Sequence, residues 1–209
     1  MRTFAKIFIV IGIVLSGVNI TGISLVNDKR KDLDVSLSYA AALEAMDQTY
    51  AEYGSSSESI ERLAQIYADS IHYSWPTEWA QVPLTDNWIL HFLGYTDAAF
   101  VWLGLSQVEN LFSEFQSLNY ERGFRRGYGI CSQNAIAFVD LVERRYGMQG
   151  AVVALGGHVV AEVETPAGGV LADPSLGIFL PMGSDDLGET VPPSVYQAYA
   201  ATNTEIMFL

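Results

Sequence analysis

The feature that most constrains the fold is a run with helical periodicity from Cys131 to Tyr146, followed by three short β-like segments. Its apolar side chains recur every three or four residues and share one face, formed by Cys131, Ala135, Phe138, Val139 and Val142. Gly147 follows directly, which is typical of a helix C-terminal cap. The β-like segments are residues 151–155, 158–164 and 169–172, separated by glycine-containing turns. The pattern predicts a helix and a small antiparallel sheet, and hence an α+β fold.

Further helices are predicted upstream of this core. Residues 33–53 contain strongly helix-favouring alanines, and residues 58–73 carry apolar side chains near helical spacing. A Gly-Ser-Ser-Ser loop separates the two, and Pro76 stops the second. Residues 79–115 are rich in aromatic side chains and are expected to form one or two more core helices. Residues 128–130 are predicted to be a loop before the Cys131 helix.

An uncharged segment over residues 7–26 precedes this part of the chain. Its length suits a membrane helix, which needs roughly 20 residues, whereas the apolar core of a signal peptide has about 7–15. A cleaved signal segment stays open as the alternative, because residues 22–24 form a small-x-small site. Residues 1–32 are predicted to be a membrane anchor or signal segment with a charged linker, and residues 33–209 one domain. The signal-anchor layout favours a domain outside the cytoplasm, although basic residues flank both ends of the segment.

Charge and cysteine content exclude several classes of function. The chain has 209 residues with 11 Lys and Arg against 24 Asp and Glu, a net charge of −13. So acidic a chain lacks the clustered basic residues that phosphate recognition requires, and no nucleic-acid partner is expected. A single cysteine forms no intramolecular disulfide, and the cysteine and the three histidines lack the close spacing of a zinc site. Neither a metal nor a cofactor is predicted.

Cys131, His158 and Asp173 form the constellation that indicates chemistry. Cys131 opens the predicted helix, where unpaired backbone N–H groups and the helix dipole favour a thiolate. A neighbouring imidazole activates such a thiol by taking its proton, and a carboxylate holds that imidazole in the useful tautomer. His158 opens one predicted strand and Asp173 closes the next, at similar distances from the turn between them. The hairpin therefore predicts that base and orienting acid lie nearly opposite each other.

Three ordered motifs resemble the core of transglutaminase-like proteins, whose papain-like fold packs a nucleophile helix on a small antiparallel sheet. They are Gly-Ile-Cys-Ser-Gln-Asn-Ala at residues 129–135, His-Val-Val-Ala-Glu-Val at 158–163, and Leu-Ala-Asp-Pro-Ser at 171–175. The resemblance covers about residues 123–180 and implies Cys131 as nucleophile, His158 as base and Asp173 as orienting acid. The chain departs from the family at Val159 and Val160, where many members carry an aromatic residue. The backbone N–H of Cys131 is the expected first oxyanion donor, and no second donor is identified.

The resemblance implies a cysteine enzyme that forms an acyl-enzyme on Cys131 from a protein or peptide-like amide, ester or thioester. Hydrolysis and acyl transfer both stay open, including acetyl transfer of the arylamine N-acetyltransferase type. The candidate substrate-binding residues are Asn87, Trp88, Tyr128 and Glu162. The chain is also similar to membrane-associated transglutaminase-like proteins of bacterial exopolysaccharide machinery, which implies envelope or polysaccharide-synthesis partners. The alternative function is a non-catalytic, membrane-tethered accessory domain of such a complex.

Overall fold

The computed structural model describes residues 6, 9–17, 35–73, 120–155, 157–187 and 192–200. The chain divides into two compact units, one of Met1–Asn27 with Ala80–Leu118 and one of Asp28–Trp79 with Asn119–Leu209. In the first unit, residues 9–17 are helical. The helices and strands that surround the candidate site all belong to the second unit.

The predicted membrane anchor lies only partly within the described residues. Its residues 9–17 are helical, whereas residues 7–8 and 18–26 lie outside the described ranges. No helix in the described part of the chain has the length and apolar character that crossing a membrane requires. The aromatic segment 79–115 also lies outside the described ranges, so the single domain over residues 33–209 stays a prediction.

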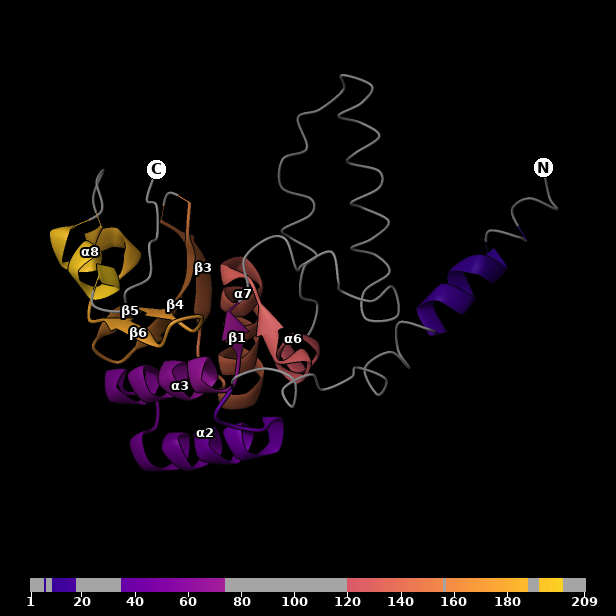
Figure 1. Ribbon diagram of the computed structural model, residues 1–209, viewed down its shortest axis with the longest axis horizontal. Helices are drawn as coiled ribbons and strands as arrows, with labels where there is room; N and C mark the ends of the chain where they lie inside the picture. Colours follow the sequence, from indigo (N-terminus) through magenta and orange to yellow (C-terminus); the bar gives the residue numbers. More distant parts are fainter. Residues whose placement is uncertain are drawn as a thin grey trace, which may run out of the picture. The chain divides into compact units, whose positions relative to one another are not determined.

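A four-stranded antiparallel sheet in the order β3-β4-β5-β6 forms the centre of the second unit (Figure 1). Its strands are β3 (Gly150–Ala154), β4 (Val159–Thr165), β5 (Gly168–Asp173) and β6 (Ile178–Leu180). The antiparallel meander predicted after the Cys131 helix is confirmed, and its three strands lie within one residue of the predicted bounds. Strand β6 pairs with β5 and extends the predicted sheet. The described architecture therefore combines helices with a small antiparallel sheet.

Helix α7 (Cys131–Tyr146) packs against β3 and β4 and has the bounds that the sequence predicts. Its predicted apolar face is buried, with no exposed area on Phe138 or Val142. Gly147 ends the helix in a left-handed conformation with a φ of 68°, which glycine adopts because it has no Cβ. Preceding α7 is a short helix in contact with it, α6 (Tyr120–Arg126). Cys131 is thus fixed at the N-terminal end of a buried, well-packed helix.

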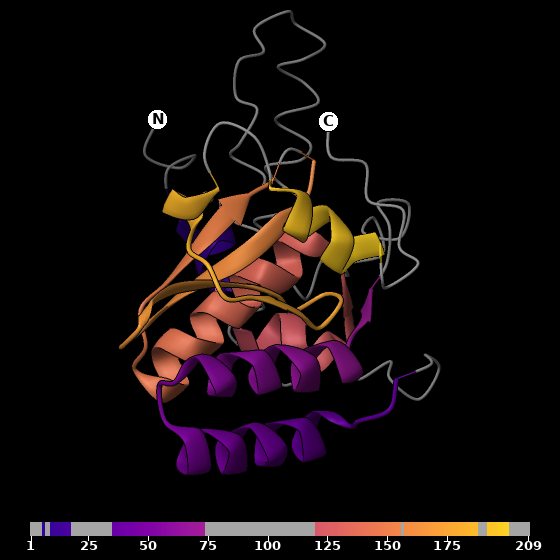
Figure 2. The same cartoon turned by 90° about the vertical axis from the view of Figure 1, so that its left-hand side faces the viewer.

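Two further helices, α2 (Tyr39–Tyr53) and α3 (Ser57–Asp69), stack beside the sheet, with α3 against β5 and β6 and α2 against α3 (Figures 1 and 2). Ser38 and Ser56 cap these helices, because each side-chain oxygen accepts a hydrogen bond from a backbone N–H three residues on. The sequence prediction of a helix from residue 33 is therefore wrong for residues 35–38, which precede the Ser38 cap.

The predicted helix over residues 58–73 is too long, because its end belongs to a small parallel sheet. Helix α3 stops at Asp69, and β1 (His72–Tyr73) pairs with β2 (Tyr128–Gly129). The His72 N–H donates a hydrogen bond to the carbonyl oxygen of Gly127 at 2.8 Å. Residues 128–129 are accordingly a strand and not the predicted loop. Pairing between distant segments overrides the local pattern here, and it brings Tyr73 beside the segment that leads to Cys131.

Strands β4, β5 and β6 bury apolar side chains on both faces of the sheet, whereas the residues of β3 are exposed or half-buried. One face packs in a cluster with α3 and α7 through Ala161, Val163, Val170 and Ala172. The other packs against Val195 and Tyr199 of α8 (Pro193–Ala200) through Val160, Leu171, Ile178 and Leu180. By strand alternation Asp173 lies on the α8 face together with Leu171. Helix α8 therefore covers the face that carries the predicted orienting acid.

Candidate active site

Cys131 is the first residue of α7. Ile130 before it is extended, and its N–H donates a hydrogen bond to Gln133 Oε1 at 3.3 Å, which ties the incoming chain to the first turn. Cys131 is buried, with 9% of its surface exposed. The first N–H groups of a helix have no acceptor within the helix, and the positive end of the helix dipole lies there. The sulfur atom therefore lies where the fold favours a negative charge.

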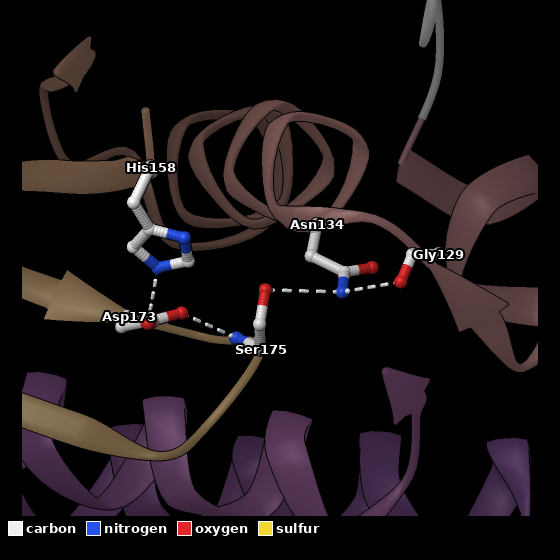
Figure 3. Close-up of polar contacts among 5 residues, drawn as sticks. All are labelled: Gly129, Asn134, His158, Asp173 and Ser175. Carbon is white, nitrogen blue, oxygen red and sulfur yellow. Dashed lines mark hydrogen bonds and ion pairs between the residues drawn. The ribbon is translucent and has the colours of Figure 1, made fainter. Parts of the chain in front are cut away.

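His158 and Asp173 form a buried hydrogen-bonded pair at one end of the sheet (Figure 3). His158 directly precedes β4, Asp173 ends β5, and 2.7 Å separates His158 Nε2 from Asp173 Oδ2. Each side chain is only 1% exposed. Ala161 lies opposite Ala172, and continuing this register sets Asp173 opposite Val160. The hairpin thus brings the histidine and the aspartate together, with an offset of two residues.

The turn after β5 orients the carboxylate of Asp173. Its Oδ1 accepts a hydrogen bond from the Ser175 backbone N–H at 2.8 Å, while Oδ2 meets His158. Aspartate side chains often bond the backbone two residues on in this way. The Asp173 carbonyl oxygen accepts the N–H of Gly177 at 2.9 Å, and Gly177 has a left-handed φ of 68°. Two different groups therefore fix the two carboxylate oxygens.

The neighbours of His158 hold its ring in the protonated form at neutral pH. Burial lowers the pKa of His158, but the hydrogen bonds with Asp173 and with Cys131 raise it more, and the pKa is about 9. Because Nε2 is bonded to Asp173, Nδ1 is the ring nitrogen left for Cys131, and it lies on the α7 side of the ring (Figure 3). Thiol, imidazole and carboxylate therefore interact in that order, as in enzymes with an activated nucleophile.

Two tyrosines outside the predicted set border this chain. Tyr199 of α8 is 2% exposed, and its ring meets the His158 ring in a T-shaped contact with 5.4 Å between centroids. Burial, followed by the charge of Asp173, raises the pKa of Tyr199. Burial, followed by the charges of Cys131 and Asp173, raises the pKa of Tyr73. Both phenols therefore stay protonated near neutral pH.

The sequence pattern does not reveal these tyrosines, because both reach the site through contacts between distant segments. The helical periodicity before Pro76 includes Tyr73, which in fact lies in β1. Tyr199 belongs to the tail over residues 183–209, from which no element is predicted. The four-residue spacing of Val195 and Tyr199 is the signal that indicates a buried helical face there.

Replacing Tyr199 by phenylalanine should lower the free energy of unfolding by about 1–2 kcal/mol, because the hydroxyl loses its electrostatic interaction with the Asp173 carboxylate while the ring contact with His158 stays. Tyr199→Leu also removes the ring contact and should cost about 1 kcal/mol more. Urea unfolding at pH 7 measures both changes. Tyr50→Phe is the matched control, since Tyr50 donates to the neutral carbonyl of Tyr146 at 2.9 Å, at the C-terminal end of α7. Equal losses in the two phenylalanine variants would contradict an interaction of the Tyr199 hydroxyl with the charge of Asp173.

Of the predicted substrate-binding residues, the structure describes Tyr128 and Glu162. Tyr128 is buried in β2, three residues before Cys131, and stays a predicted substrate contact. Glu162 accepts the Ser184 N–H at 2.7 Å and the Ser184 hydroxyl at 2.6 Å, at the start of the short 3-10 helix η3 (Ser184–Asp186). These bonds give the Glu162 carboxylate a structural role at η3. Asn87 and Trp88 lie outside the described residues.

Within the described ranges, no group of three His, Cys, Asp or Glu side chains is placed to hold a metal ion. No family model matches the chain, and neither a curated protein nor a solved structure matches it with significant similarity. The chemistry of the site is therefore inferred from its residues, their burial and their hydrogen bonds.

Proposed function

We propose that this chain is a transglutaminase-like cysteine enzyme that forms an acyl-enzyme on Cys131. The observation that carries the proposal is the buried His158–Asp173 pair, with 2.7 Å between imidazole and carboxylate, which interacts with the Cys131 thiol at the start of α7. A thiol at a helix N-terminus beside a protonated imidazole meets the requirements of a nucleophilic cysteine. The order of nucleophile helix, histidine and aspartate turn on a small antiparallel sheet supports a transglutaminase-like, papain-like fold.

The proposed reaction starts when the Cys131 thiolate attacks a substrate carbonyl carbon and forms a C–S bond. The negative charge moves to the carbonyl oxygen, where the backbone N–H of Cys131 is the expected donor. The imidazolium of His158 then gives its Nδ1 proton to the leaving amine, alcohol or thiol as the bond to that group breaks. A thioester remains on Cys131. Water or an amine, losing a proton to Nδ1, attacks this thioester and releases the acyl group with the thiolate restored.

In this scheme Asp173 positions the base and does not react. Its Oδ2 holds Nε2 of His158, so that Nδ1 is the nitrogen that exchanges protons with Cys131 and the substrate. The carboxylate also balances the charge of the imidazolium, which exists both in the resting pair and during release of the acyl group. The resemblance of the motifs extends the proposal to a membrane-anchored enzyme, with its domain outside the cytoplasm, that acts on protein or peptide-like substrates in exopolysaccharide or cell-envelope biology.

The proposal predicts a covalent intermediate on a single atom. Cys131 is the only cysteine, so a thioester on the chain reports that residue. Full-length protein is mixed separately with an activated ester, a thioester and a peptide amide, quenched in acid and analysed by intact-mass spectrometry. The mass of the acyl group should appear on the wild type with at least one substrate and be absent from Cys131→Ala. A primary amine that shortens the lifetime of the adduct and gains the acyl group would indicate transfer, and insensitivity to amine would indicate hydrolysis.

The same experiment discriminates against a non-catalytic accessory domain. His72→Ala serves as the matched control, because it changes a histidine at the start of the two-residue strand β1 and leaves the proposed chain intact. An accessory domain would form no adduct with any substrate class, and Cys131→Ala at normal abundance would keep full cellular function. These two results together would refute the enzymatic proposal.

A further inference from the structure

A buried asparagine connects the nucleophile segment to the aspartate turn. Asn134 lies one turn after Cys131 in α7, and its Nδ2 donates to the Gly129 carbonyl oxygen at 3.3 Å and to Ser175 Oγ at 3.1 Å (Figure 3). Asn134 is 2% exposed and Ser175 is 5% exposed. One amide group thus bridges two segments that lie about 40 residues apart in the sequence.

Ser175 extends this chain of hydrogen bonds toward the proposed base. Its hydroxyl oxygen accepts from Asn134, and its backbone N–H donates to Asp173 Oδ1 at 2.8 Å. The other carboxylate oxygen of Asp173 is 2.7 Å from Nε2 of His158. The result is a buried chain of hydrogen bonds that starts at Gly129, two residues before the nucleophile, and ends on the imidazole (Figure 3).

Asn134 fits so tightly that a shift of its amide group would also shift the backbone that it contacts. A Cβ atom added to Gly129 would overlap Asn134 Oδ1, so the amide rests directly on the backbone that leads into Cys131. On its other side, Ser175 belongs to the turn that closes after Asp173. Packing through residues such as Phe138 fixes α7 as a whole on the sheet. The chain of hydrogen bonds instead joins the N-terminal end of α7, which carries the nucleophile, to the end of the sheet that carries the proposed base. A misplacement of about 1 Å at such a junction can lower a reaction rate about a hundredfold.

We propose that Asn134 and Ser175 are positioning residues that set the separation between the Cys131 sulfur and the imidazole of His158. The inference rests on the proposed function, because it assigns them an effect on the proposed thiol–imidazole pair. Neither residue touches the reacting atoms. Each acts through the segment it holds, Asn134 through the backbone at Gly129 and Ser175 through the carboxylate of Asp173.

A double-mutant cycle on the full-length chain tests this role, with the rate of Cys131 alkylation by iodoacetamide from pH 5.5 to 9.5 as the readout. Ser175→Ala removes the hydroxyl acceptor but keeps the N–H that binds Asp173, and it should lower the rate at pH 6 about tenfold and move the profile to higher pH. Asn134→Ala should have an effect at least as large. The double variant should be no slower than Asn134→Ala, because the two residues act in one chain. Ser175→Thr keeps a hydroxyl and should restore most of the rate.

A control variant separates positioning from a general loss of stability. Thr165→Val removes a part-buried hydrogen bond of 2.7 Å to the Gly168 carbonyl, in the turn at the end of β4 away from His158. It should lower the melting temperature and leave the alkylation profile unchanged. An unchanged profile in Ser175→Ala and Asn134→Ala, or effects that simply add in the double variant, would overturn the inference. If His158→Ala also leaves the profile unchanged, the proposed function fails; if His158→Ala alone moves it, only the positioning role fails.

Discussion

Replacing His158 by alanine should lower the rate at which iodoacetamide alkylates Cys131 at pH 6 by about a hundredfold. An ordinary thiol, with a pKa near 8.5, is only about 0.3% ionised at that pH, and only the thiolate reacts. In the wild type, the protonated ring of His158 and the N-terminal end of α7 both favour the thiolate. Without the imidazole, only the position at the N-terminal end of α7 still favours the thiolate, so the thiolate fraction falls steeply.

The shape of the pH profile carries more information than one rate. For the proposed thiolate–imidazolium pair, the wild-type rate should exceed the His158→Ala rate at pH 6, and the profile should change near pH 9, where the imidazole loses its proton. The rate for His158→Ala should instead climb through pH 8 to 9, as it does for a simple thiol. Stopped alkylation followed by intact-mass spectrometry measures both profiles, and the single cysteine makes the mass shift unambiguous.

His72→Ala is the matched control for this experiment. His72 precedes Tyr73 in β1, and successive strand residues point to opposite faces, so the two side chains diverge. The wild-type profile should therefore persist in His72→Ala. Equal profiles in the wild type and His158→Ala would show an idle or shielded thiol, and the accessory-domain alternative would then be favoured.

Local pattern was sufficient for the elements that carry the proposed triad. Helix α7 begins and ends where predicted, because a clear apolar face is bounded by Gly147 at one end and by the extended Ile130 at the other. Strands β3, β4 and β5 follow from short apolar runs between turn residues. The meeting of His158 and Asp173 could be predicted because both belong to one hairpin, whose register is fixed by its turn.

The features that the sequence pattern could not predict depend on contacts between residues that are far apart in the chain. Strands β1 and β2 have two residues each, too few for any period, and they exist only because they pair with each other. Tyr199 acquires its place from packing of α8 on the sheet. In the sequence, Asn134 has the features of an ordinary polar residue of a helix. Its contact with Ser175 exists only because the folded chain places that turn beside it. Local propensity specifies none of these contacts.

Folding stability should depend on pH through His158, in a direction that its pKa determines. Its ordinary pKa is 6.5, and its pKa in the folded chain is about 9. Because the folded state binds this proton more tightly, the stabilisation is complete below pH 6.5 and is lost as the pH rises through about 9. One pKa unit corresponds to about 1.4 kcal/mol, so this group contributes up to about 3 kcal/mol to the free energy of unfolding. The test is made in Cys131→Ala, where His158 is the only titrating member of the pair; because Cys131 raises the pKa of His158, the contribution there should be smaller and be lost at a pH below 9.

In that background, Asp173→Asn should remove most of the pH dependence and cost about 3 kcal/mol at pH 6, where it leaves a buried cation without its anion. Burial lowers the pKa of His158, and the hydrogen bond with Asp173 is the largest effect that raises it. Urea unfolding from pH 5.5 to 9.5 measures the curves. Asp47→Asn is the control, since a hydrogen bond with Arg145 lowers the pKa of Asp47 and its titration falls below this range. A pH dependence that survives Asp173→Asn would mean that another group holds the imidazolium, and Asp173 would lose its proposed role.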